Sequence, residues 1–348
     1  MKVIAASGEG SSDFACGILK NDGLVAFPTE TVYGLGGNAY SDKAVAEIFK
    51  CKNRPLFNPV SVCYPSFFAA SRDVEINAKA ELLAEEFLPG ALTIVLKRRA
   101  DSKISRLCSA GGDTVGIRVP NNLIALNLLK KLDFPLASPS ANTSSELSTT
   151  TAQSVRESLK NYDQLVILDG GACNLGIEST IIDLSEENQP RILRKGAISQ
   201  EEIESRCGFK LISVGAAGVS VTTEMSVAAG TSVSATGMPV ETGESETARA
   251  TEVFKLSHYK PAKPIVINVR KIEEGDALLA FGNPIPGAKY CLNLSKNSDL
   301  TEAAKNLFSM LRKLDSTDAR RIRVMPIPNT GIGSAINDRL EKAAQKVN

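Results

Sequence analysis

Residues 214–248 are dominated by Ala, Gly, Ser, Thr and Val, and they contain no lysine, no arginine and no aromatic residue. Such small side chains bury too little apolar area to offset the entropy lost when a segment becomes ordered. The stretch therefore predicts a long linker, and it divides the 348-residue chain into two parts. Each part is long enough for a core of its own. We expect domains at residues 1–210 and 262–348, joined by a linker over 211–261.

The first part alternates short apolar runs with helical periodicity. Its runs of branched residues, bounded by Gly, Pro or Asn, predict strands over 24–28, 91–96, 114–119, 164–169 and 179–184. Ser41 is placed to cap a helix, and three-and-four spacing predicts further helices over 76–87 and 123–132. This pattern is typical of an α/β domain with a substantial sheet.

The second part is a smaller α/β unit. Apolar runs predict strands over 264–269, 277–281, 288–294 and 321–327. One strongly amphipathic helix is predicted over 300–314 and a last helix over 332–346. We expect an open, doubly wound sheet of Rossmann-like type.

Composition excludes several classes of function. The chain has one histidine, His258, so it lacks the material for a His-based triad or a two-histidine zinc site. Its seven cysteines form no CxxC pair, which indicates reduced, mostly buried thiols. A net charge of +1 does not favour a wide basic surface for duplex nucleic acid, and a small anionic ligand fits better.

The apolar pattern also argues against a membrane protein. No apolar run approaches the length of about 20 residues that spans a bilayer, and the first residues, MKVIAASGEGSSDF, do not resemble a secretory signal. We therefore expect a cytoplasmic protein without a membrane anchor.

Two segments carry more polar groups than their local structure needs. FPTETVYGLG, residues 27–36, follows a predicted strand with hydroxyls, a carboxylate and glycines that would let backbone approach a ligand. In KCKNRPLFNP, residues 50–59, Lys52 and Arg54 lie two apart near two prolines. On an extended chain they would point the same way and grip phosphate oxygens, although a solvated helix end explains them equally well.

Three further segments add to these. In TVGIRVP, Thr114 and Arg118 share one face of a strand, and an inward arginine needs an anion to meet. Ser138, Ser140 and Asn142 alternate in SPSAN before a hydroxyl-rich loop, for which an ordinary polar loop is the simpler interpretation. GIESTIIDL, residues 176–184, is followed by RILRKG.

Together these motifs, in this order over residues 10–200, resemble the threonylcarbamoyl-AMP synthase family, whose catalytic domain is YrdC-like. SHYKP, residues 257–261, is similar to the motif that precedes the C-terminal domain in the longer family members. The resemblance implies a twisted mixed sheet with helices around a deep cavity, and a linker passing over its mouth. It also implies that L-threonine, bicarbonate and ATP, the last carried with Mg²⁺, give threonylcarbamoyl-AMP and pyrophosphate.

The resemblance assigns roles to residues of this chain. Lys52 and Arg54 would be catalytic. L-Threonine would contact Thr31, Arg118, Ser140 and Ser179, and Cys63 stands where family members usually carry a threonine-contacting histidine. ATP would contact Lys52, Arg54, Asn58, Thr114, Asn142, Thr150, Arg194 and Tyr259. Glu30 and Tyr33 would brace their loop.

The product would pass to the machinery that modifies adenosine 37 of tRNAs, with weak tRNA contact allowed. One alternative is an RNA-binding or ribosome-associated module of the same fold without catalysis. Another is a carbamoyl-transfer domain for metallocentre maturation, although the zinc-finger cysteine spacing of those chains is missing here. The C-terminal domain could hold a nucleotide, brace the linker or dock a partner.

Overall fold

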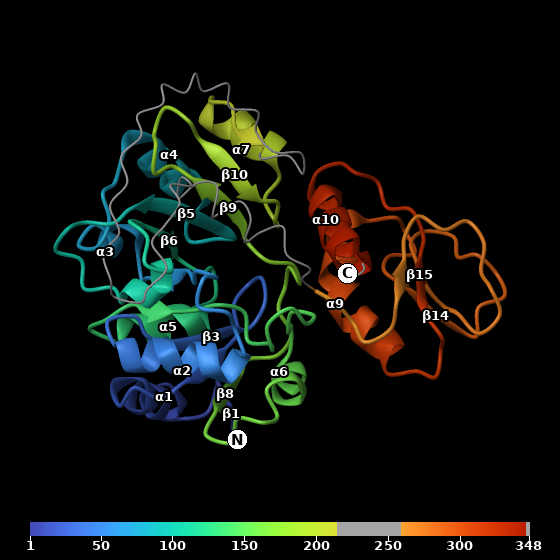
Figure 1. Cartoon of the computed structure of the whole chain (residues 1–348), viewed down its shortest axis with the longest axis horizontal. Coiled ribbons are helices and arrows are strands. Elements are labelled where there is room, and N and C mark those ends of the chain that lie inside the picture. Colours follow the sequence, from blue (N-terminus) through green and yellow to red (C-terminus); the bar gives the residue numbers. More distant parts are fainter. Residues whose placement is uncertain (214–258, 346–348) are drawn as a thin grey trace, which may run out of the picture.

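The computed structural model describes residues 1–213 and 259–345, which form two α/β units lying side by side (Figure 1). Within these residues, the larger unit holds an 11-stranded sheet and the smaller one a 4-stranded sheet. The segment 214–248 that predicts a linker lies outside the described residues, so the proposed domain boundaries stay predictions.

The sheet of the larger unit is mixed. Its strands are β1 (Lys2–Ala5), β2 (Val25–Phe27), β3 (Gly34–Asn38), β4 (Val62–Cys63), β5 (Leu92–Lys97), β6 (Thr114–Arg118), β7 (Leu136–Ala137), β8 (Val166–Asp169), β9 (Thr180–Asp183), β10 (Arg191–Arg194) and β11 (Ile212–Ser213). Their spatial order is β1-β8-β2-β3-β7-β4-β6-β5-β9-β10-β11. The sheet contains both parallel pairs such as β4–β6 and antiparallel pairs such as β5–β6. The predicted mixed α/β class is confirmed.

Helices cover both faces of this sheet. They are α1 (Ser11–Lys20), α2 (Asp42–Lys52), α3 (Phe67–Ala70), α4 (Ala78–Phe87), the 3₁₀ helix η1 (Arg106–Ser109), α5 (Leu123–Lys130), α6 (Ala152–Ser158) and α7 (Gln200–Cys207). Val25 and Phe27 of β2 pack with α1 and α5, whereas Leu24 and Ala26 belong to the core that includes α2, α4, α6 and α7. This alternation follows from the two-residue period of a strand.

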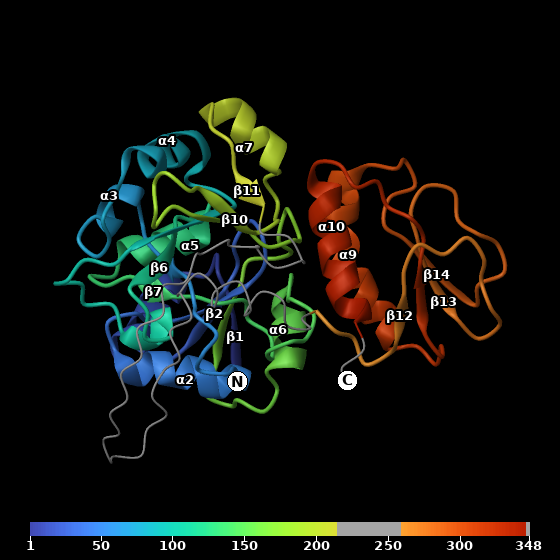
Figure 2. The ribbon, with the colours of Figure 1, turned by 45° about the horizontal axis from the view of Figure 1, so that its top comes forward.

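The smaller unit is an all-parallel sheet. Its strands run in the order β12 (Ile265–Val266), β15 (Ile322–Val324), β13 (Ala277–Ala280) and β14 (Tyr290–Asn293). Helices α9 (Leu300–Asp315) and α10 (Ile332–Ala344) pack on the face that is turned toward the larger unit (Figure 2).

The expectation of a doubly wound sheet is wrong for the described part of this unit. Leu278 and Ala280 on the second face pack against loop residues, among them Ile272 and Ile285, and not against a helix. The physical reason is length: the connections 267–276 and 281–289 have fewer residues than a helical crossover of about a dozen needs.

Most elements predicted from periodicity are present. Ser41 caps α2 by accepting a hydrogen bond from the Ala44 amide at 3.2 Å, as its position before the apolar face predicts. The predicted strands in both units and the helices over 76–87, 123–132, 300–314 and 332–346 all have counterparts, most of them somewhat shorter. No helix among the described residues is both long and apolar enough to cross a membrane.

The glycines of FPTETVYGLG belong to strand β3, which pairs antiparallel with β2. A Cβ atom on Gly36 would lie 2.7 Å from Cε1 of Phe27, and one on Gly34 would lie 3.3 Å from its Cζ. The glycines therefore make room for the buried Phe27 ring, which corrects the expectation that they let backbone approach a ligand. The strand was missed because glycine is depleted in strands generally.

This packing predicts a stability difference between two glycine substitutions. Gly36→Ala overpacks a core position and should lower the free energy of unfolding by about 1–3 kcal/mol. Gly17→Ala is the matched control, because Gly17 is exposed in α1 and a Cβ there meets nothing within 4 Å. It should stabilise the protein by about 0.5–1 kcal/mol. Thermal unfolding of both variants checks the difference, and equal midpoints would contradict it.

Candidate functional site

The β2–β3 loop, residues 28–33, forms a buried polar cluster with the end of β6. Arg118, the last residue of β6, donates from Nη2 to Oε1 of Glu30 and to Oγ1 of Thr31, both at 2.8 Å. Thr29 Oγ1 lies 2.9 Å from Thr31 Oγ1 and donates to the carbonyl of Val32 at 2.6 Å. TVGIRVP predicts an inward arginine that meets a ligand carboxylate or phosphate, whereas the anion that Arg118 meets here is the protein's own Glu30, so the ligand contact stays a prediction.

Two atoms of this cluster remain unpaired. Nε of Arg118 and Oε2 of Glu30 are buried and have no hydrogen-bond partner among the described residues. Burial would lower the pKa of Arg118, but the charge of Glu30 raises it overall. Buried polar atoms without partners are costly. A ligand that carries both a negative and a positive group would supply a partner for each of these two atoms.

The SPSAN segment lies directly beside this loop. The Leu35 amide donates to the Pro139 carbonyl and the Ala141 amide to the Tyr33 carbonyl, both at 2.8 Å. Asn142 donates from Nδ2 to the Glu146 carbonyl at 3.1 Å, and its buried Oδ1 has no partner in the described part of the chain. The structure therefore brings together two segments that the sequence places more than a hundred residues apart.

Lys52 is held by the same segment. It is the last residue of α2, its side chain is 1% exposed, and Nζ donates to the carbonyls of Ser140 and Asn142. Burial, followed by the charge of Arg54, lowers its pKa to about 7. An ammonium has three N–H donors, so one remains for a ligand.

The expected geometry of Lys52 and Arg54 is wrong. They do not share an extended chain, because Lys52 is helical and Asn53 after it is left-handed, with φ 51°. Arg54 turns back and donates from Nε to the Asn58 carbonyl at 3.0 Å and from Nη2 to the Pro59 carbonyl at 2.7 Å. The helix C-cap thus overrides the extended segment that the two prolines suggested.

A further arginine joins this group of cations. Arg194, at the end of β10, donates from Nε and Nη2 to the Ser179 carbonyl at 3.1 and 2.9 Å, and from Nη2 to Ser179 Oγ at 3.0 Å. Burial, with a smaller contribution from the charge of Arg194, lowers the pKa of Arg54 to about 10, although Tyr259 acts in the opposite direction. Burial also lowers the pKa of Arg194. Repulsion between cations that share a poorly solvated site marks a place for an anion.

The site residues predicted from the sequence and not yet described are Tyr259, Thr114, Asn58, Thr150 and Cys63. Tyr259 is buried, with its ring stacked on Phe308 at a centroid distance of 5.7 Å. Thr114 is at the opposite end of β6 from Arg118, and Asn58 and Thr150 are buried. Cys63 pairs with Arg118 in the β4–β6 register, and burial raises the pKa of its thiol to about 11. Cys63 is therefore an uncharged thiol at neutral pH.

The sequence did not predict the ion pairs that two carboxylates of the site form. Glu30 was expected only to brace its loop, yet it is the ion-pair partner of Arg118. Glu178 of GIESTIIDL is buried and pairs with Arg339 of α10 at 2.9 Å. The sequence does not indicate a role for Arg339, because Arg339 lies in an ordinary amphipathic pattern and its partner Glu178 is 161 residues away.

A cavity of about 500 Å³ opens beside the loop and is lined by Glu30, Asn121, Asn174 and Ala197 among others. Within residues 1–213 and 259–345, no group of three or more His, Cys, Asp or Glu side chains is placed to hold a metal ion.

The sequence matches two family models. Residues 17–196 match Sua5_yciO_yrdC, described as telomere recombination, and residues 198–345 match Sua5_C, the threonylcarbamoyl-AMP synthase C-terminal domain. The second match begins before the predicted linker and runs through the smaller unit.

Relatives of known name match nearly the whole chain. A threonylcarbamoyl-AMP synthase of Pyrococcus abyssi is 35% identical, covering 95% of this chain and 93% of the relative. One of Bacillus subtilis is 31% identical, covering 95% and 92%. The crystal structure of P. abyssi Sua5 complexed with L-threonine superposes with a TM-score of 0.80, covering 99% of this chain and 97% of the other at 34% identity. The chain belongs to the threonylcarbamoyl-AMP synthase family.

Proposed function

We propose that this chain joins L-threonine, bicarbonate and ATP to form threonylcarbamoyl-AMP and pyrophosphate. Family membership supports the reaction, and so does the P. abyssi relative that was crystallised with L-threonine. The observation that carries the proposal is the buried cluster of Arg118, Glu30 and Thr31, whose unpaired Nε and Oε2 await a ligand with both charges.

L-Threonine fits this cluster as a zwitterion. Its carboxylate would accept from the free Nε of Arg118, and its ammonium would donate to the free Oε2 of Glu30. Its hydroxyl would then face the hydroxyls of Thr31, Ser140 or Ser179, which lie on the segments around the cluster. Cys63, next to Arg118 in the sheet, would contribute an uncharged contact in place of a histidine.

ATP would occupy the group of cations. Lys52, Arg54 and Arg194 would neutralise its phosphates, each already oriented by backbone carbonyls. Tyr259 would close over the nucleotide, with the remaining predicted contacts from Asn58, Thr114, Asn142 and Thr150. Mg²⁺ would be carried by the phosphates, which is its usual mode of binding in such sites. It would add neutralising charge.

The reaction then needs positioning more than a covalent nucleophile. The threonine amine, once deprotonated, attacks the bicarbonate carbon; a C–N bond forms and water leaves. An oxygen of the resulting carbamate attacks the α-phosphate, and the bond from that phosphorus to the bridging oxygen breaks, releasing pyrophosphate. Bicarbonate, the carbamate, ATP and pyrophosphate are all anionic, so fixed cations can lower both barriers. This accounts for an enzyme with one histidine.

The product is a mixed anhydride, which is reactive toward nucleophiles. Its consumer must be an acyl-type transferase, and we propose the machinery that modifies adenosine 37 of tRNA, in the cytoplasm. Weak direct contact with tRNA is compatible with this scheme. No observation on the described residues favours the RNA-binding alternative.

Purified protein supplied with Mg-ATP, L-threonine and bicarbonate should release pyrophosphate and form threonylcarbamoyl-AMP. Release should depend on both L-threonine and bicarbonate. It should be lost in the double variant Lys52→Ala with Arg54→Ala. Pyrophosphate release that persists without threonine would rule out the proposed reaction.

Substitution of Arg118 should weaken the binding of threonine and leave the binding of ATP nearly unchanged. Arg118→Gln removes a charged donor to the carboxylate, and hydrogen bonds to charged groups contribute about 1.5–3 kcal/mol. The KM for L-threonine should therefore rise about 10- to 100-fold, with a small change in the KM for ATP.

Glu30→Gln should raise the threonine KM similarly, while binding of 3-hydroxybutyrate, which lacks the amine, should hardly change. Equal losses for both ligands would contradict the role of Glu30.

ATP binding should depend on the protonation of Lys52. Because its pKa is about 7 in the free protein, Lys52 loses its charge as the pH rises through that value. ATP affinity measured by calorimetry should fall above about pH 7, by up to tenfold per pH unit. Lys52→Met is the control that removes this titration while leaving that of ATP itself. A wild-type profile parallel to that of Lys52→Met would show that Lys52 does not contact ATP as a cation.

A further inference from the structure

Arg339 of α10 reaches out of the smaller unit into the larger one. Its side chain is buried, and Nε donates to Oε2 of Glu178 at 2.9 Å while Nη2 donates to the carbonyl of Lys195 at 2.9 Å. Its guanidinium also lies over the ring of Tyr259, at 4.9 Å from the centroid. One side chain of the C-terminal unit therefore contacts three segments near the candidate site.

These contacts fall next to proposed substrate-binding residues. Glu178 precedes Ser179, and Lys195 follows Arg194, so Arg339 holds both segments one residue away from the Ser179–Arg194 contact. The Ala197 amide donates to the Glu178 carbonyl at 3.0 Å and ties the two segments together. Arg339 thus contacts both of the segments that carry the residues proposed for threonine and for the nucleotide.

The hydrogen-bond network around Glu178 also includes a third segment, the loop at residues 147–150. Ser148 donates to Oε1 of Glu178, and Arg312 of α9 donates to the Leu147 carbonyl. Both contacts lie on the hydroxyl-rich loop that carries Thr150. Burial would raise the pKa of Glu178, but Arg339 and then Arg194 lower it overall, so Glu178 stays ionised.

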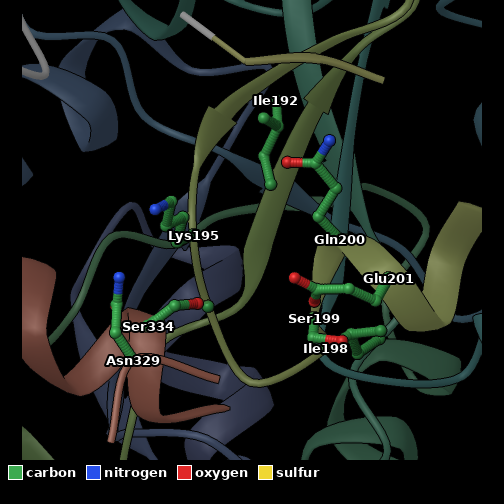
Figure 3. Close-up of a pocket in the computed structure, with 9 residues that line it drawn as sticks. Ile192, Lys195, Ile198, Ser199, Gln200, Glu201, Asn329 and Ser334 are labelled. Atoms are coloured by element: carbon green, nitrogen blue, oxygen red, sulfur yellow. The ribbon is translucent and has the colours of Figure 1, made fainter. Parts of the chain in front are cut away.

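The junction around Arg339 is not uniformly packed. A cavity of about 150 Å³ separates the β10–α7 connection, at Lys195 and Gly196, from the start of α10, at Asn329 and Ser334 (Figure 3). Beside this cavity the hydrogen bond from Arg339 to the Lys195 carbonyl bridges the two units.

We propose that Arg339 is a positioning residue for the reaction: it holds the Glu178–Ser179 and Arg194–Lys195 segments so that threonine and ATP meet correctly. The proposal rests on the function proposed above. It gives the C-terminal unit a role in completing the site of the larger one.

A purely structural role must be separated from this one. A buried ion pair is weak support for stability, because replacing both charges is often neutral, whereas removing one partner leaves an unpaired buried charge. The double variant Glu178→Gln with Arg339→Gln removes both charges of this pair together, and Asp338, which also pairs with Arg339, keeps its ion pair with Lys342 at 3.0 Å. The stability and the kinetics of the double variant therefore report on different properties.

Arg339→Gln alone should lower the melting temperature and raise the KM for both L-threonine and ATP. The double variant should regain most of the melting temperature but keep both KM values about 10- to 100-fold above wild type, as expected when reactants are misplaced. Arg339→Lys should give an intermediate KM, because a lysine can pair with Glu178 but lacks the planar fork that also reaches Lys195. A double variant with wild-type stability and wild-type KM values would overturn the proposal.

Asp276→Asn with Arg323→Gln is the matched control. This buried pair, at 2.6 Å, lies within the smaller sheet and contacts none of the proposed site residues. It should alter the melting temperature and leave both KM values unchanged.

Amide hydrogen exchange tests the same idea without any substrate. In the Glu178→Gln, Arg339→Gln variant the Ala197 amide should exchange faster than in wild type, and in the Asp276→Asn, Arg323→Gln control it should not. A wild-type protein that releases no pyrophosphate would refute the proposed function, and this exchange measurement would still decide whether Arg339 holds the two segments. Unchanged exchange at Ala197 would overturn the proposal.

Discussion

The constraint on which the site depends is that one buried lysine, Lys52, and two partly buried arginines repel one another. Lys52, Arg54 and Arg194 are oriented mainly by carbonyl oxygens, which fix a cation without cancelling its charge. Arg118 is paired with a carboxylate but keeps one donor unpaired. Burial, and after it repulsion from a neighbouring arginine, lowers the pKa values of Lys52 and Arg54. The fold leaves these positive charges available to anionic ligands instead of neutralising all of them with its own carboxylates.

The two units of the chain share this arrangement. Val32, Leu147 and Ile177 of the larger unit belong to the same apolar core as α9 and α10. Gly176 is needed here, because a Cβ on it would lie 2.5 Å from backbone atoms of Lys305, and its φ is +69°. The loops that carry the proposed substrate contacts are therefore packed against the C-terminal unit, and Arg339 adds a polar link to the apolar one. The smaller unit therefore supports the loops of the site by packing against them, and it does not pack as an independent domain.

Much of the fold could be predicted from local pattern. Strands such as β5 and β6 and helices such as α2 and α9 follow from hydrophobic periodicity and capping residues. Strand β3 could not be predicted, because its glycines are explained by the ring of Phe27 on the neighbouring strand. Edge strands such as β11, which lies inside the range assigned to the linker, are too short to give a pattern.

The site was predictable where chemistry lies in contiguous motifs and unpredictable where it depends on tertiary contacts. Arg118 was identified from its strand and Thr31 from the family resemblance of its segment, and the structure brings them within 2.8 Å. The turn of Arg54 onto its own loop, the pairing of Glu30 with Arg118 and the reach of Arg339 to Glu178 depend on how distant segments pack. No spacing in the sequence encodes them.

The most direct test of this account is a crystal structure of the protein with L-threonine and a non-hydrolysable ATP analogue. The account predicts the threonine carboxylate at Nε of Arg118, its ammonium at Oε2 of Glu30, and the analogue's phosphates among Lys52, Arg54 and Arg194. Threonine bound elsewhere, with Nε of Arg118 and Oε2 of Glu30 still lacking a ligand, would contradict it.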